Sequence, residues 1–280
     1  MHALRFILIA ISIAMFAALG WRAVNPPRPP GRIVTPEPVI PEIAAPEPEP
    51  PPPSSFETPA KARGAVEDRI AQDGDFEPFF SSLRDNFASD YTKILDGFAK
   101  VAFEKRQVES VDYYLSESIR GLRQARGLLA AQAESSLLDR IFVMQAAVIE
   151  ALAATDARLC ADFIYGGASE AFFAFSETHR PLIAEMALAN LAAIIDGASS
   201  KIARLTPGEA EFQELEDALV AMGLGRDEID ALIDGKAPDP PLPDARMCAA
   251  GVSYLKALAG LPEGTRIRIE ALVAELMART

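Results

Sequence analysis

Histidine and cysteine are scarce in this sequence, with only two of each among 280 residues. A zinc site needs three or four clustered nitrogen or sulfur ligands, which this chain could supply only with unpaired cysteines. His2 lies in the leading tail, and His179 stands alone before a helix, where a surface or capping role is the simplest explanation. We therefore expect no metal and no cofactor.

Catalytic motifs are also missing. The chain contains no Gly-x-Ser-x-Gly, no phosphate-binding loop and no His-Glu-x-x-His. Neighbouring carboxylates such as Glu216-Asp217 and Asp227-Glu228 occur, but on the polar faces of expected helices. We expect a protein that is not an enzyme. The alternative is a hydrolase that uses two acidic residues, which needs a cleft with one carboxyl of raised pKa.

Positive charge is in short supply. The chain carries 27 Lys and Arg against 40 Asp and Glu, a net charge of −13. Residues 1–60 hold four arginines and five glutamates, so nearly all of the excess negative charge lies in residues 61–280. An acidic domain without a basic stripe is a poor partner for phosphate backbones and anionic lipid surfaces. Nucleic-acid binding is excluded on this ground, and the acidity is best explained by solubility.

Strand patterns are absent after residue 61. No alternation of apolar and polar residues with hairpin turns is found there, whereas apolar residues recur at spacings of three and four, as at Phe79, Leu83 and Phe87. Residues 61–280 are therefore predicted to form an all-α domain, an irregular multi-helix bundle. Individual helices are expected over residues 78–102, from Ser110 to about residue 133, and over 181–205, the last as an alanine-rich core helix. Thr206-Pro207-Gly208-Glu209 has the pattern of a capping box.

The N-terminal residues 1–25 contain the one long apolar run, FILIAISIAMFAALGW over residues 6–21. Its 16 residues approach the ~20 that a bilayer core requires. Ala18-Leu19-Gly20 would suit signal-peptide cleavage after Gly20, which would give a secreted protein. We favour an uncleaved signal-anchor, because Trp21 and Arg22 suit the membrane interface and a tether follows directly.

Residues 26–60 form a linker. Fourteen of the 22 prolines lie there, alternating with glutamate and small residues. Such a stretch cannot bury enough surface to fold, so we expect it to be disordered and extended, in polyproline II conformation. A spacer is the favoured role over a docking strip for an aromatic groove. The expected plan is a bacterial inner-membrane protein, single-pass, with its domain facing the periplasm, although arginines after the apolar run oppose that orientation.

A repeated hexapeptide contains both cysteines. Residues 156–161 read DARLCA and residues 244–249 read DARMCA. In each copy the aspartate, Asp156 or Asp244, is placed to cap a helix whose first turn carries the cysteine. We expect Cys160 and Cys248 to form a disulfide in an oxidising compartment, and two buried free thiols are the alternative.

The arginines of the repeat, Arg158 and Arg246, lie at the unfavourable end of the helix dipole. Each is expected either to pair with a carboxylate on a neighbouring helix or to reach solvent. From the sequence as a whole we expect a membrane-tethered binding or scaffolding protein. Its partners would be the membrane, through the N-terminal helix, and a protein of the envelope.

Overall fold

The computed structural model describes residues 56–166, 169–236 and 238–279. Within these ranges the secondary structure is helical and no strand occurs, which confirms the predicted all-α class. The predicted N-terminal helix in residues 1–25 lies outside the described residues, as does most of the linker 26–60. The predictions for those segments therefore stay predictions.

The helices of the described residues are α2 (Pro59–Ala71), α3 (Glu77–Asn86), α4 (Ala88–Lys105), α5 (Val111–Arg126), the 3₁₀-helix η2 (Gly127–Gln132), α6 (Ser135–Thr155), α7 (Ala157–Ile164), α8 (Glu170–Thr178), α9 (Arg180–Ser200), α10 (Glu209–Ala221), α11 (Arg226–Ile233), α12 (Asp244–Gly260) and α13 (Glu263–Met277).

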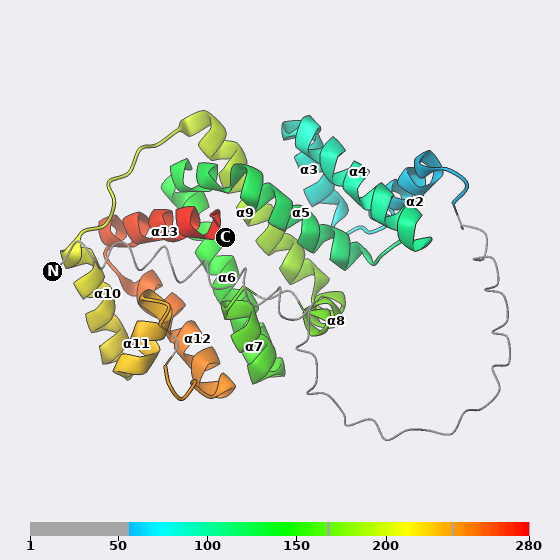
Figure 1. Ribbon diagram of the computed structural model, residues 1–280. Coiled ribbons are helices and arrows are strands. Elements are labelled where there is room, and N and C mark those ends of the chain that lie inside the picture. Colours follow the sequence, from blue (N-terminus) through cyan, green and yellow to red (C-terminus); the bar gives the residue numbers. More distant parts are fainter. Residues whose placement is uncertain (1–55, 167–168, 237, 280) are drawn as a thin grey trace, which may run out of the picture.

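Two long helices, α6 and α9, pack against each other at the centre of the molecule (Figure 1). α9 also contacts η2 and α3, whereas α6 contacts α7, α12 and α13. α2, α3 and α4 lie at one end of the molecule, and α10, α11 and α12 lie at the other. One cluster of buried apolar side chains, which includes Val66, Leu152 and Leu219, extends through all of these layers. The described helices therefore share one main core.

α9 is the one helix of the described residues that is long and apolar enough to cross a membrane. Here it is a core helix, as predicted, with Ile183, Leu191 and Ile194 buried among its neighbours. It ends at Ser200, earlier than the predicted end at residue 205. Lys201 takes the left-handed conformation with φ of 51°, which stops the helix.

The C-terminal half of α9 touches the backbone of η2. A Cβ atom added at Gly197 would lie 1.8 Å from the carbonyl oxygen of Leu129, so only glycine permits this approach. Just past α9, the N–H of Ile202 and the guanidinium of Arg204 donate to carbonyl oxygens at the end of η2. These are carbonyls that a short helix leaves without internal partners.

A buried polar network joins α5, α8 and α9. The Asp112 carboxylate is 0% exposed and accepts hydrogen bonds from the Ser176 hydroxyl (2.7 Å) and the Arg180 guanidinium (2.8 Å). Arg180 also pairs with Asp73, in the turn between α2 and α3, at 3.2 Å. A buried carboxylate is tolerated only with such partners, so the network fixes the relative positions of these helices.

The helix predicted over residues 78–102 is wrong, because the structure breaks it at Phe87 into α3 and α4. The Asn86 side chain donates to the Ser82 carbonyl at 2.8 Å, a local hydrogen bond of the kind that competes with helix continuation. The half-buried Phe87 ring lies beneath the Arg126 guanidinium, 5.3 Å from its centroid. The spacing of apolar residues continues across the break, so the sequence pattern does not reveal the break.

Two helix ends also differ from the predictions. Ser110 caps α5, but the α-helix stops at Arg126 and only the 3₁₀-helix η2 continues beyond it. Thr206 does not cap α10. The N-cap is Gly208, whose N–H donates to the Glu211 carboxylate at 2.9 Å, so the capping interaction lies two residues later than the sequence motif.

The glycine contact between α9 and η2 predicts a large effect of Gly197→Ala. The added methyl group meets backbone that cannot rotate away, so the free energy of unfolding should fall by about 3 kcal/mol. The matched control is Gly97→Ala in α4, where a Cβ meets nothing within 4 Å. That change should stabilise the protein by about 0.5–1 kcal/mol through helix propensity. Urea denaturation measures both, and similar values for the two variants would contradict the contact.

Candidate functional site

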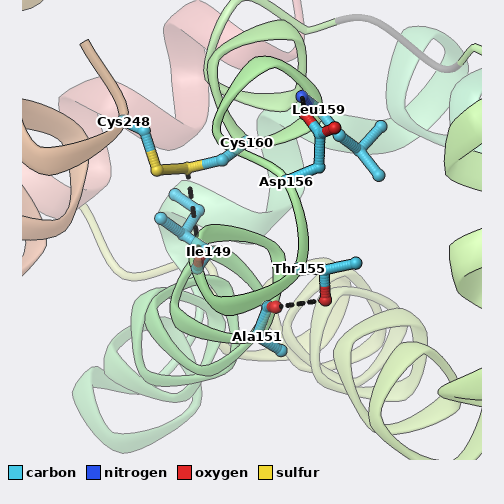
Figure 2. The surroundings of a disulfide bond; sticks show 7 residues. All are labelled: Ile149, Ala151, Thr155, Asp156, Leu159, Cys160 and Cys248. Atoms are coloured by element: carbon cyan, nitrogen blue, oxygen red, sulfur yellow. Dashed lines mark hydrogen bonds between the residues drawn. A yellow bond between two sulfur atoms is a disulfide. The ribbon is translucent and has the colours of Figure 1, made fainter. Parts of the chain in front are cut away.

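The two cysteines meet where α7 and α12 touch, beside the end of α6 (Figure 2). Their sulfur atoms are bonded at 2.04 Å, and their Cα atoms are 5.5 Å apart, within the range of about 4.4–6.8 Å that a disulfide requires. Cys160 is 0% exposed and Cys248 is 4% exposed. The Cys160 Sγ lies 3.9 Å from the carbonyl oxygen of Ile149 in α6. The bond is thus enclosed by three helices.

The two helices remain in close contact one turn beyond the disulfide. A Cβ added at Gly251 of α12 would lie 2.3 Å from Cδ1 of Ile164 in α7. Ala161 and Met247, each next to a cysteine in the sequence, belong to one small buried cluster that includes Ala231 of α11. Close packing on both sides of the bond indicates a structural disulfide, shielded from solvent.

Only one aspartate of the repeat caps its helix. Asp156 is extended, with φ −157° and ψ 121°, and its carboxylate accepts from the Leu159 N–H at 2.9 Å (Figure 2). The prediction for Asp244 is wrong, because Asp244 is itself the first helical residue of α12 and Pro243 is the N-cap. No side-chain hydrogen bond caps α12, so the Asp244 carboxylate does not have the role that Asp156 has in α7. Asp244 still lies near the positive end of the helix dipole.

The two arginines of the repeat have different partners. Arg246 forms an ion pair with Glu228 of α11, whose side chain is 6% exposed. Burial acts to raise the pKa of Glu228, but the hydrogen bonds from Arg246 and from backbone amides lower it on balance. Arg158 is 79% exposed and lies 3.9 Å from Asp162 in its own helix. The neighbouring-helix interpretation therefore holds for Arg246 and the solvent interpretation for Arg158.

A second cluster of charged groups lies between α6 and α13. Glu270 of α13 is 1% exposed, Asp139 of α6 is 35% exposed, and Arg266 lies between them. The Arg266 Nε is 3.2 Å from Asp139 Oδ1 and 3.8 Å from Glu270 Oε1. Glu270 Oε2 is buried, and no donor among the described residues reaches it. Arg266 thus lies closer to Asp139 than to Glu270.

Burial, the charge of Asp139 and a hydrogen bond to Asp139 raise the pKa of Glu270 to about 8, although Arg266 and Arg204 oppose the shift. At neutral pH the Glu270 carboxyl is therefore largely protonated and donates to Asp139. Burial and then the Glu270 charge raise the pKa of Tyr254, in α12. The acid pair was not singled out from the sequence. The signal was present, because Glu270 shares a helix face with the buried Ile267 and Ala274.

An open groove of about 550 Å³ lies near the acid pair, between the start of α6, the coil after α9 and the first half of α13. Its lining includes Ser135, one turn before Asp139, and Ile267, one turn before Glu270, but neither carboxylate. Leu205 also lines it and is 77% exposed. The two carboxylates face each other, but they are bridged by an arginine and lie outside the lining of the groove.

Large exposed apolar side chains are spread over the described surface instead of forming one broad patch along a single element. They are Leu128, Val143, Tyr165, Leu205, Val220 and Met222. No group of three or more His, Cys, Asp or Glu side chains suited to a metal ion occurs in the part of the chain that the structure describes. Comparisons with protein-family models, with curated proteins and with solved structures found no match.

The disulfide predicts a stability that depends on redox conditions. A cross-link that closes a loop of 88 residues restricts the unfolded chain by roughly 4–5 kcal/mol on the chain-entropy model. Replacing Cys160 and Cys248 together by serine should therefore lower the melting temperature clearly. Reduction of the unfolded chain, followed by refolding with the reducing agent present, should lower the melting temperature of the unmodified chain. The same treatment should leave the melting temperature of the double variant unchanged. An unmodified chain that melts identically with and without reductant would show that the bond is absent in solution.

The repeat offers a matched pair of cap substitutions. Asp156→Ala removes the hydrogen bond to the Leu159 N–H and should lower the free energy of unfolding by about 1 kcal/mol. Asp244→Ala removes only a charge near the helix dipole and should lower it by about 0.3 kcal/mol. Chemical denaturation of both variants gives the comparison. An equal or larger loss for Asp244→Ala would show that Asp244 caps α12 after all.

Proposed function

We propose that this chain is a membrane-tethered binding or scaffolding protein of the bacterial envelope. The apolar residues 6–21 would anchor it in the inner membrane, and the proline-rich residues 26–60 would hold the helical part away from the bilayer. The helical part would then present its surface to a protein partner in the periplasm.

The observation that carries this proposal is the disulfide between α7 and α12. A disulfide persists in oxidising compartments and is rare in the cytosol, which favours a domain outside the cytoplasm. An apolar segment followed by a proline-rich stretch fits the same location. A mature chain that begins at Trp21 in the native host would instead make this a secreted protein.

The groove beside α13 is the surface we favour for the partner. It is open, and Leu205 extends from its edge with most of its side chain in solvent. A large apolar side chain that is exposed beside an open groove offers surface that a bound partner would bury. Ser135 and Arg268 supply polar groups to the groove lining.

Affinity capture from membranes of the native host tests this assignment, with the full chain as bait. Leu205→Ser should reduce recovery of a specific partner at least roughly tenfold, because an interface anchor is lost. The control is Val220→Ser, which removes another exposed side chain, at the end of α10 and outside the groove lining. Equal recovery with both variants would remove the groove from the proposal, and recovery of no partner would count against a binding role.

A hydrolase is the second candidate, and the acid pair is the observation that favours it. Glu270 has the raised pKa of a general acid, and Asp139 faces it as a second carboxyl group. The burial of Glu270 and its position outside the groove lining count against this role. Hydrolysis of a glycan or peptide by the unmodified chain, lost in Glu270→Gln, would replace the binding proposal.

A further inference from the structure

We propose that Asp139 and Glu270 form a proton-operated latch between α6 and α13, closed while the two carboxyls share one proton and released when both are charged. The latch joins two helices that are distant in the sequence and pack against each other and against η2. This inference does not depend on the proposed binding function.

The charges around the pair make the proton necessary for close packing. The facing groups are Asp139 from α6, Arg266 from α13, Arg204 from the coil after α9 and Tyr254 from α12. The Arg204 guanidinium donates to backbone carbonyls at the end of η2, so its hydrogen bonds are used elsewhere.

Arg266 is the cation that forms ion pairs with both carboxylates, and its Nε lies nearer to Asp139 than to Glu270. Deprotonation leaves Glu270 Oε2 charged, buried and without a donor. A buried charge in that position is strongly unfavourable, so the ionised state favours separation of the helices.

The direction of the pH effect follows from proton linkage. Glu270 has a pKa of about 8 in the folded chain against an ordinary value of 4.5. Between these values the folded chain keeps a proton that the unfolded or detached segment has released. The stability that this proton supplies is complete below the lower value and is lost as pH rises through the upper one.

The groove beside α13 would respond to the latch. Glu263, Gly264, Ile267 and Arg268, all on α13, form more than half of the groove lining. Glu270 lies on the same helix, one turn beyond Ile267. A loosened α13 therefore changes the width of the groove, and the surface offered there depends on the pH of the compartment.

The test is hydrogen exchange of the full chain between about pH 5 and about pH 9, corrected for the intrinsic pH dependence of exchange. Across the window of the Glu270 titration, the opening equilibrium of α13 should rise by up to roughly tenfold per pH unit, as one linked proton requires. The melting temperature should fall over the same window. Glu270→Gln keeps the shape of the side chain without the charge and should abolish both dependences.

Two further variants keep the test decisive. Glu275→Gln, on the same helix with its side chain 44% exposed, should behave like the unmodified chain. Asp139→Asn should move the transition to lower pH without abolishing it, because the charge of Asp139 raises the pKa of Glu270, and it replaces Glu270→Gln should that variant fail to fold. A flat profile for the unmodified chain would overturn the latch. So would a pH-dependent melting temperature with unchanged α13 exchange, or an equal effect of Glu275→Gln and Glu270→Gln.

Discussion

The contact between the backbones of α9 and η2 is the constraint on which the rest of the fold depends. No side chain separates the two elements at Gly197, so their spacing is set by main-chain atoms and has little freedom to vary. η2 is continuous with α5, lies just before α6 in the chain and packs against α13. Fixing η2 on α9 therefore positions three further helices. The residues just after α9 strengthen the contact, because Ile202 and Arg204 donate hydrogen bonds to carbonyl oxygens of η2.

The two ends of the molecule are held to this centre in different ways. On the side of α2 and α3, the link is polar: Arg180 at the start of α9 binds both Asp73 and Asp112. Such a network adds little net stability, but any arrangement that breaks it leaves a charge buried. On the side of α12 the link is covalent and acts mainly by restricting the unfolded chain. The polar network of Arg180 selects the arrangement of the helices, and the disulfide stabilises that arrangement.

The sequence was sufficient for the features that depend on local pattern. Apolar spacing predicts helices, and the repeated hexapeptide together with an oxidising compartment predicts the pairing of Cys160 with Cys248, with two free thiols as the alternative. Asp156 caps its helix because the chain enters α7 in an extended conformation. Asp244 is followed by nearly the same residues, but it is preceded by Pro243, which takes the N-cap position. The repeated hexapeptide begins at the aspartate, so it does not include the preceding residue, which differs between the two copies.

The features that the sequence did not predict arise from contacts between distant segments. The helix breaks at Phe87 although the apolar stripe continues, and the Phe87 ring is covered by Arg126 from another helix. The pKa of Glu270 depends on burial and on Asp139, more than a hundred residues earlier in the chain. An acid on an apolar helix face marks a residue with an unusual environment, but it does not identify the facing group. Only the packing of α13 on α6 supplies that information.

The disulfide has a mechanical consequence for a chain that is pulled from its two ends. Force entering at α2 and leaving at α13 would pass from α7 to α12 through the sulfur–sulfur bond. The segment between the cysteines, with α8, α9, α10 and α11, would carry no tension and could not be extended while the bond is intact. α9 lies within this protected loop, together with Gly197. Under load the chain outside the loop would be the part that lengthens, and α9 would be shielded from extension for as long as the bond is intact.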